Sequence, residues 1–239
     1  MSAPAKEKGT ELKVLMTHRP SHRAWMLCLC TAMLAVWGCG ETAPGALGQI
    51  DFAPECGSLD QACLEQSLNA PIAAGATVEM GINFKFQGSS GPPMRMEAID
   101  EAAFKLDGSR VEAVKPGVRP LMVIGPDGLV LDFIHLWVAI PDELRLVSHT
   151  DAGLVIGPLG ASAQMLPGDE LNLTVEPFAN SQALLGDFDV EWEVTGDAVA
   201  ILQDGVLGAH RIVARQPGQA SLTATALGLS IAVDVEVLP

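Results

Sequence analysis

The sequence predicts an all-β protein in which two tandem antiparallel β-sandwiches follow an N-terminal signal segment, a tether and a short helix. The 239 residues include 24 glycines and 16 prolines, whereas aromatic residues make up only 5% and tyrosine is absent. Apolar and polar residues alternate over many short stretches, and one succession of strands and turns occurs twice. The expected boundaries are 1–38 for the signal peptide, 39–55 for the tether, 56–70 for the helix, 71–141 for the first sandwich and 142–239 for the second.

The repeat is clearest toward the end of each copy. Residues 111–138 and 211–237 each read as a short strand, a Pro-Gly pair, an apolar strand, a turn and a long last strand. The pairs are Pro116-Gly117 and Pro217-Gly218. Proline presets φ and glycine supplies the positive φ of a turn, so each pair is predicted to mark the entry to the two closing strands.

An apolar run near the N-terminus predicts export. Residues 24–37 form an uncharged stretch that follows several basic residues. Because a helix needs about 20 apolar residues to span a bilayer, this run fits the core of a secretory signal peptide better than a transmembrane span. An ordinary signal peptide and a single-pass anchor remain open, and either Met1 or Met16 can be the start.

The run ends in Val36-Trp37-Gly38-Cys39, which resembles the lipobox of bacterial lipoproteins. The resemblance implies that the Cys39 sulfur is diacylated and that Cys39 becomes the N-terminus after cleavage, so a membrane would be a partner through this lipid. Trp37 departs from the family, which favours a small or β-branched residue there. Gly40, in place of aspartate, suggests the outer membrane, with a periplasmic or surface-facing location.

The remaining cysteines predict a disulfide. Cys28 and Cys30 lie in the segment that would be removed and Cys39 would carry the lipid. Cys56 and Cys63 remain, and an even pair of thiols in an oxidising compartment favours a disulfide. A zinc site is the alternative, but two cysteines without a nearby histidine provide too few ligands.

A tether and one helix are expected before the first sandwich. Residues 39–55 are rich in glycine, alanine and proline and lack periodicity, which favours a flexible tether. Ser58 and Gln61 have the spacing of a capping box, which predicts the start of the helix. Leu64 and Leu68 lie on one helical face, and the predicted disulfide would staple this turn.

Strand periodicity begins after the helix. In residues 77–86 apolar and polar residues alternate, as in a strand with one buried face. Asp107-Gly108 marks a tight turn. The last strand of the first copy, residues 129–138, is apolar on both faces, and such strands are usually covered on both sides. We therefore expect the helix or the neighbouring domain to cover its outer face.

The second copy repeats this plan more regularly. Alternation marks strands in residues 170–176, 187–194, 220–226 and 229–237. Residues 141–168 are expected to form a long connection with one strand around residues 144–147. Trp192, at the centre of its strand, is predicted to fill the core of the second sandwich.

Both copies resemble bacterial Ig-like domains of group 2. That family has a glycine before a first long strand, an aromatic-centred strand, a short strand and a Pro/Ala-Gly turn before two closing strands. The matching positions are Gly168, Trp192, residues 199–202 and Gly218 in the second copy, and Gly75, Phe104 and Gly117 in the first, with Met96 in place of the tryptophan. The resemblance covers nearly all of residues 73–239. It implies two Ig-like β-sandwiches and says almost nothing about activity.

The charge argues against one class of partner. The formal net charge is −15, and residues 39–239 hold nine basic and 27 acidic residues, a net charge of −18. Such a surface repels phosphate backbones, so we expect no nucleic-acid partner. Solubility is the simplest reason for the excess of acid.

The sequence contains no recognisable catalytic, cofactor or metal-binding motif. Ser148, His149 and Asp151 are the one loop cluster with the residue types of a catalytic triad, but a triad needs side chains from separated segments. Acidic residues alternate along residues 187–193. Neighbours on one strand face are about 6.5–7 Å apart, too wide to share one calcium ion, so a solvated outer face is the simpler interpretation.

These features predict a non-catalytic envelope protein. We expect a lipid-anchored module for binding, spacing or structural support, without a cofactor, that meets a protein or polysaccharide of the envelope. A carbohydrate- or cation-binding lipoprotein is one alternative and would use Trp137 or the acidic row near Asp187. An envelope hydrolase is another and would need titratable groups that converge in a cleft. An exposed Trp137 beside polar loop groups favours ligand binding, and a buried Trp137 favours a scaffold.

Overall fold

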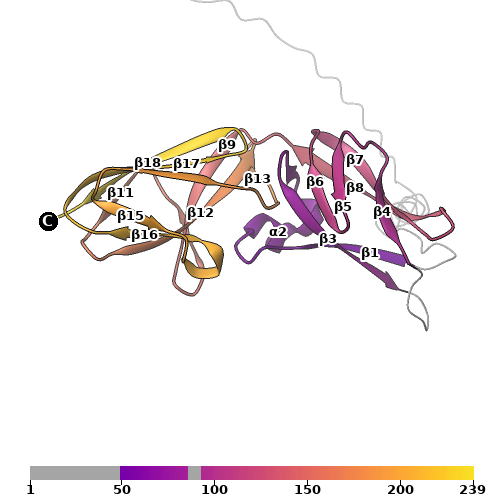
Figure 1. Cartoon of the computed structure of the whole chain (residues 1–239), viewed down its shortest axis with the longest axis horizontal. Helices are drawn as coiled ribbons and strands as arrows, with labels where there is room; N and C mark the ends of the chain where they lie inside the picture. The colour runs from indigo at the N-terminus through magenta and orange to yellow at the C-terminus, as the bar shows by residue number, and fades with distance from the viewer. Residues whose placement is uncertain (1–48, 86–92) are drawn as a thin grey trace, which may run out of the picture. The chain divides into compact units, whose positions relative to one another are not determined.

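The computed structural model describes residues 49–85 and 93–239 (Figure 1). The predicted signal peptide, Cys39 and most of the predicted tether lie outside these residues. The described chain is all-β apart from a short α-helix and two 3-10 turns, η1 (Ser67–Asn69) and η2 (Val206–Gly208), and its strands form four sheets that pair into two sandwiches. The predicted all-β class and the two tandem sandwiches are confirmed.

The first sandwich uses strands from residues 49–139. One sheet has the order β1-β3-β6-β5, with β1 (Gln49–Glu55), β3 (Thr77–Lys85), β6 (Arg110–Ala113) and β5 (Phe104–Asp107). The other has the order β2-β8-β7-β4, with β2 (Ile72–Ala73), β8 (Val130–Ala139), β7 (Gly117–Ile124) and β4 (Arg95–Ala98). The short β2 pairs with β8 in parallel, whereas β7 and β8 form a long antiparallel hairpin.

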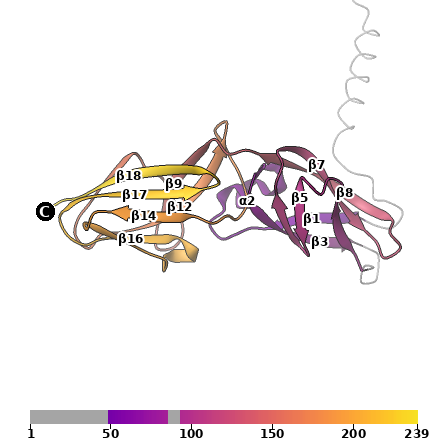
Figure 2. The same cartoon turned by 45° about the horizontal axis from the view of Figure 1, so that its top comes forward.

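The second sandwich uses strands from residues 143–237. One sheet has the order β10-β9-β12-β16-β15, with β10 (Val155–Pro158), β9 (Glu143–His149), β12 (Glu170–Ala179), β16 (His210–Ala214) and β15 (Val199–Leu202); β13 (Gln182–Ala183) also pairs with β12. The other has the order β11-β18-β17-β14, with β11 (Ser162–Met165), β18 (Leu229–Val237), β17 (Gly218–Ala226) and β14 (Glu191–Thr195). Figure 2 shows β14, β17 and β18 side by side.

Both sandwiches share one topology. The first strand of each is divided between the sheets, so that its later part, β2 or β11, lies parallel to the last strand. If the strands are lettered A to G, each sandwich has one sheet with the order A-B-E-D and one with the order A′-G-F-C, and the second sandwich adds β10 beside A and β13 beside B. The A-B-E-D and C-F-G sets are those of constant-type Ig domains. The structure therefore shows the tandem Ig-like sandwiches that the resemblance implies.

Each sandwich has its own core, built from the inward row of every strand. Val78 and Met80 on β3 are buried, whereas Thr77, Glu79 and Gly81 are partly exposed, which confirms the predicted alternation there. The largest fully buried side chains of the first core include Phe104, Met80, Leu121 and Leu136, and those of the second include Leu146, Leu173, Ile212 and Leu222. The inward alternation thus accounts for both cores.

The two Pro-Gly turns behave as predicted. Gly117 has φ of 113° and Gly218 has φ of 151°, and each begins the strand after the turn, β7 or β17. A side chain at these φ values would strain the backbone, so glycine is required where the chain enters the closing hairpin.

The α-helix, α2 (Gln61–Gln66), follows β1, and the Cys56–Cys63 disulfide joins it to the preceding turn with a Cα–Cα distance of 5.5 Å. The predicted disulfide is therefore present. The predicted capping box is wrong, because the N-cap is Asp60, whose Oδ1 accepts a hydrogen bond from Cys63 N at 2.9 Å. Leu64 faces solvent instead of packing inward.

Removal of this disulfide is expected to destabilise the first sandwich. Because the bridge closes a short loop, we expect the double substitution Cys56→Ser and Cys63→Ser to lower the free energy of unfolding by about 2–3 kcal/mol. Urea denaturation followed by circular dichroism measures the change. An unaltered midpoint in the double variant would contradict the prediction.

Two predicted irregular segments are strands. Residues 49–55, assigned to the tether, form β1, which pairs with β3 along seven residues from Gln49↔Lys85 to Glu55↔Glu79. Residues 141–168, assigned to a long connection with one strand, contain β9, β10 and β11. These segments are edge or near-edge strands, where prolines such as Pro54 and Pro158 are tolerated because one side of the strand has no ladder partner.

The outer face of β8 is not covered as predicted. Phe133 and Trp137 on this face are 54% and 47% exposed, whereas Leu136 and Val138 on the inner face are buried. Neither α2 nor the second sandwich screens these two side chains from solvent. The strand is apolar on both faces, but only one face is in the core.

Candidate functional site

The strongest structural feature of the described chain is the junction between the two sandwiches. Residues Leu184–Asp187, which we call the junction segment, follow β13 and hydrogen-bond to the first sandwich. Leu185 N donates to Pro71 O at 2.9 Å, and Leu185 O accepts from Ala73 N at 3.0 Å. Asp187 and Thr77 exchange two backbone hydrogen bonds of 2.8 Å each. The segment between β13 and β14 of the second sandwich thus adds short β-bridges to β2 and β3 of the first sandwich.

Leu185 belongs to the core of the first sandwich although it comes from the second domain. Its side chain is fully buried and clusters with Ile72, Val78 and Val138 of the first domain, among others. The adjacent Leu184 lies in a small separate cluster with Ala73, Ala76 and Ala179. Leu185 therefore completes the core of the first sandwich, and Leu184 packs in a cluster with residues of both domains. The interface thus consists of apolar packing from both sandwiches.

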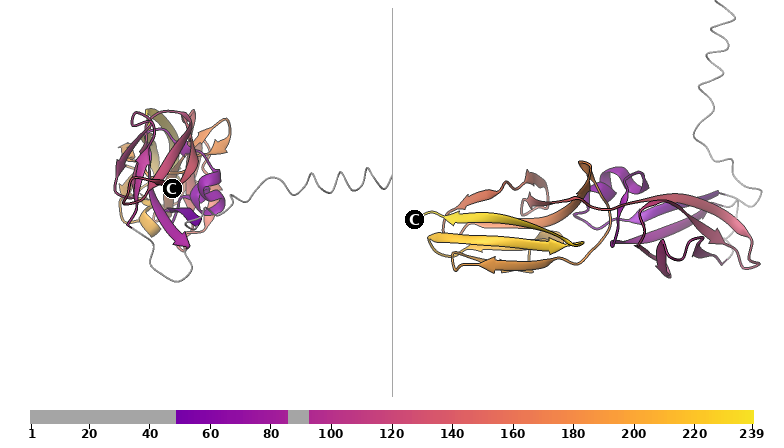
Figure 3. Two further views of the ribbon diagram at one scale, coloured as in Figure 1. Left: turned by 90° about the vertical axis from the view of Figure 1, so that its right-hand side faces the viewer. Right: turned by 90° about the horizontal axis from the view of Figure 1, so that it is seen from above.

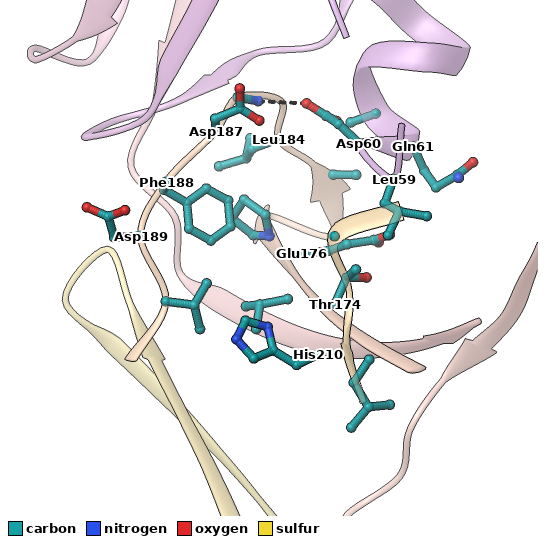
Figure 4. A pocket seen from close by; sticks show the side chains of 18 of the residues that line it. Leu59, Asp60, Gln61, Thr174, Glu176, Leu184, Asp187, Phe188, Asp189 and His210 are labelled. Carbon is teal, nitrogen blue, oxygen red and sulfur yellow. Dashed lines mark hydrogen bonds between the residues drawn. The ribbon is translucent and has the colours of Figure 1, made fainter. Parts of the chain in front are cut away.

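Asp60 ties the helix to the same segment. Its Oδ1 caps α2, and its Oδ2 accepts a hydrogen bond from Gly186 N at 3.0 Å (Figure 4). Gly186 has φ of 120°, and a Cβ at this position would lie 2.8 Å from the Ala76 Cβ. Glycine is therefore needed on two grounds, a backbone conformation that side chains disfavour and a close approach of the first domain.

A pocket of about 520 Å³ lies beside the junction segment. Leu59, Asp60 and Gln61 border it from the α2 region, and Thr174, Glu176, Phe188 and His210 border it from the second domain (Figure 4). Trp192 also lines it and stacks on His210 with a centroid distance of 5.0 Å. The lining combines an aromatic and aliphatic floor with the carboxylates of Asp60, Glu176, Asp187 and Asp189.

Burial controls the electrostatics of this pocket. Desolvation raises the pKa of the Asp60 carboxyl, while hydrogen bonds from Gly186 and Cys63 oppose the rise and the nearby Asp187 adds to it. Desolvation also raises the pKa of Glu176, assisted by the negative charges of Asp60 and Glu65. The carboxylates disfavour one another's ionised form, whereas the positive charge of Arg145 opposes the rise in the pKa of Glu176.

The substitution Glu176→Gln is expected to stabilise the protein at neutral pH. The folded pKa of Glu176 lies above its unfolded value, so the folded state holds the proton more tightly. Stability from this group is therefore greatest below about pH 4 and falls as the pH rises through the raised pKa. We expect a melting temperature about 2 °C higher at pH 7 and little change at pH 3.5.

Calorimetry at the two pH values measures this effect. Glu193→Gln is the matched control. Glu193 is exposed on the outer face of β14, so this substitution removes the same charge at a position away from the pocket. Equal shifts in the two variants would mean that the net charge of the protein, and not the environment of Glu176, determines the response.

The Ser148, His149 and Asp151 cluster is not a catalytic relay. Ser148 Oγ donates to Gly157 O at 3.0 Å, and His149 Nε2 lies 2.7 Å from Thr174 Oγ1. Asp151 Oδ1 instead accepts from Asn172 Nδ2 at 3.2 Å. Ser148 and His149 are buried, and desolvation lowers the pKa of His149. The three side chains therefore bond to three different neighbours of β9, namely Gly157, Thr174 and Asn172.

The predicted acidic row is divided by the fold. Asp187 belongs to the junction segment and Asp189 lines the pocket, whereas Glu191 and Glu193 are exposed on the outer face of β14. Within residues 49–85 and 93–239, no group of three or more His, Cys, Asp or Glu side chains is placed to hold a metal ion. Trp192 is half-buried and packs against the second core, close to its predicted position.

Trp137 lies on an open sheet surface. Its partner on β7 is Val118, and the neighbouring outward side chain on β8 is His135. The polar loop groups that a ligand site would need are not among these neighbours. Trp137 is therefore exposed, as a ligand site requires, but lacks the polar neighbours that such a site also requires. In the described part of the chain, no helix has the length and apolar character needed to cross a bilayer.

Comparisons with known proteins find solved structures that align with this chain at low similarity. No family model matches the sequence, and the search of curated proteins gave no match. Domains 4 and 5 of the S-layer protein SbsC align at 11% identity and a TM-score of 0.30, over 80% of this chain and 98% of that one. The chain spans 28% of a longer SbsC structure.

Two further solved structures align to a similar degree. The D00-D0 domain of intimin aligns at 11% identity and a TM-score of 0.27, over 72% of this chain and 97% of that one. The Escherichia coli adhesin FdeC aligns at 12% identity and a TM-score of 0.29, over 84% of this chain and 67% of that one.

Proposed function

We propose that the protein is a non-catalytic, lipid-anchored spacer of the cell envelope that holds two Ig-like sandwiches in a fixed relation. The junction segment is the observation that carries this proposal. Five hydrogen bonds to the first sandwich and the buried side chain of Leu185 leave the two domains little freedom to pivot. A flexible linker would suit two independent binding domains, whereas a packed junction suits a spacer.

The envelope location is supported by chemistry at the start of the chain. The Cys56–Cys63 disulfide favours an oxidising compartment. The lipobox-like Val36–Cys39 sequence would place a lipid on Cys39, ten residues before β1 begins. The acidic surface argues against nucleic acid, and a protein or polysaccharide of the envelope is the partner that we propose.

Metabolic labelling with an alkyne-tagged fatty acid tests the anchor. We expect the label on the wild-type chain in the membrane fraction and its loss, with release of the protein, in Cys39→Ser. Cys28→Ser with Cys30→Ser is the matched control and should leave labelling unchanged, because both residues lie in the segment that cleavage removes. An unlabelled wild-type chain recovered in the soluble fraction would contradict the anchor.

A further inference from the structure

The first sandwich carries an apolar face that nothing in the described chain covers. It lies on the outer side of the β7–β8 hairpin and at the hairpin end. We define this face by the exposed residues Val118 (56% exposed), Leu129 (57%), Val130 (53%), Phe133 (54%) and Trp137 (47%). The outward side of an antiparallel sheet is normally polar, so exposed apolar side chains gathered on one hairpin indicate an interaction surface.

The face is a continuous feature of two paired strands. Phe133 and Trp137 lie on the outer side of β8 with His135 between them, and Phe133 contacts His135 edge-on at 5.4 Å. The residues opposite them on β7 are Met122 and Val118. The face therefore runs along the hairpin from Trp137 toward the tip, where Leu129 and Val130 follow the turn.

The strand directions place the tip of this face beside the start of β1. β3 begins at Thr77, which bonds the junction segment, and ends at Lys85, which pairs with Gln49. β8 ends next to β2 and the junction, so its first residue, Val130, lies at the far end. Figures 1 and 3 show the start of β1 and the β7–β8 turn at the same end of the first sandwich.

The chain length before β1 limits how far this end can lie from a lipid on Cys39. The ten residue steps from Cys39 to Gln49 span at most about 35 Å when fully extended. A lipid on Cys39 would therefore always keep a bilayer surface, which can bind apolar side chains, within reach of the face. Tryptophan and phenylalanine also suit the bilayer interface, where an aromatic ring can be partly buried.

We propose that the apolar face docks on the bilayer that holds the anchor, so that the first sandwich lies against the membrane. This inference rests on the lipid anchor of the proposed function. Asp127 and Asp132 flank the face, and the mature chain is strongly acidic, so a zwitterionic surface is favoured over an anionic one. Burial of the apolar side chains, and not charge attraction, supplies the binding energy.

A fluorescent label at the hairpin tip tests the docking. Lipidated Val130→Cys protein, labelled with nitrobenzoxadiazole, is reconstituted in phosphatidylcholine vesicles with brominated acyl chains. Cys39 is acylated and Cys56 is paired with Cys63, so the introduced thiol is the reactive one. The matched control is Leu166→Cys, a leucine that is 53% exposed in the second sandwich. We expect the label at 130 to be quenched about threefold more strongly than the label at 166.

A charge substitution provides the second arm. Phe133→Asp in the Val130→Cys background is expected to reduce quenching to the level of the control, whereas Leu166→Asp in that background leaves it unchanged. Vesicles of phosphatidylglycerol are expected to give weaker quenching than phosphatidylcholine. Circular dichroism spectra confirm that the substituted chains remain folded.

Flotation of the vesicles separates this inference from the anchor. Protein that fails to float with the vesicles contradicts the proposed function. Protein that floats but shows equal quenching at 130 and 166 retains its anchor and overturns the docking. A label at 130 that becomes buried without lipid, in proportion to protein concentration, would assign the face to a second copy of the chain and also overturn the docking.

Discussion

Replacing Leu185 with alanine is expected to lower the free energy of unfolding of the first sandwich by about 2–5 kcal/mol, although the residue belongs to the second domain. The side chain is fully buried among first-domain residues, so its truncation leaves a cavity there. Urea denaturation followed by tryptophan fluorescence in a Trp192→Phe background measures the loss, since Trp137 on β8 of the first sandwich is then the reporting tryptophan of the described chain.

Leu154→Ala is the matched control for that experiment. Leu154 is 67% exposed in the second domain, so the same truncation removes little buried area and is expected to cost no more than about 0.5 kcal/mol. A first sandwich whose stability is unaffected by Leu185→Ala would show that the junction segment rests on the first domain without completing its core.

Replacing Trp192 with alanine is expected to cost about 3–5 kcal/mol in the second sandwich. Trp192 packs against the second core and its ring stacks on His210 at the floor of the junction pocket. Trp192→Phe keeps most of the aromatic packing and is expected to cost much less. Trp137→Ala, which removes the same side chain from an exposed sheet face, serves as the control and is expected to leave the melting temperature nearly unchanged.

Calorimetry on the three variants measures these effects. Equal losses for Trp192→Ala and Trp137→Ala would contradict the assignment of one tryptophan to a core and the other to a surface. A loss confined to Trp137→Ala would mean that the outer face of β8 is packed against something in solution.

The strands that the sequence predicted correctly are those whose periodicity alone defines them. β3 alternates along its length and β12 over residues 170–176, and β17 and β18 alternate as far as Val237. The sequence predicts the turns at Gly117 and Gly218 because few residues other than glycine adopt a positive φ. In these elements local pattern and tertiary structure agree.

The missed strands lie at sheet edges. β1 contains an alternation, with Ile50 and Phe52 turned inward, but glycine and proline around it concealed the pattern. β10 contains Gly157 and Pro158, and its pairing with β9 shifts register there. Composition predicts irregular structure in such segments, whereas an edge position tolerates residues that a central strand rejects.

The junction segment could not be predicted, because its structure depends on a second domain. Leu184, Leu185 and Gly186 carry no local signal that distinguishes a loop from a bridge, and the alternation of acidic residues predicts an outer row that includes Asp187. The pairing of Leu185 with Ile72 joins residues more than one hundred positions apart. The exposed face of β8 was missed for the related reason that periodicity cannot say whether a second apolar face finds a partner.

A distance measurement across the junction shows whether the two sandwiches are held in a fixed relation. Spin labels at Lys105→Cys on β5 and Ser230→Cys on β18, both at exposed positions, report the separation of the two sandwiches by double electron–electron resonance. A fixed junction predicts one narrow distance distribution that broadens in Leu185→Ala. A broad distribution in the chain with Leu185 intact would contradict a spacer in which the two sandwiches are held together.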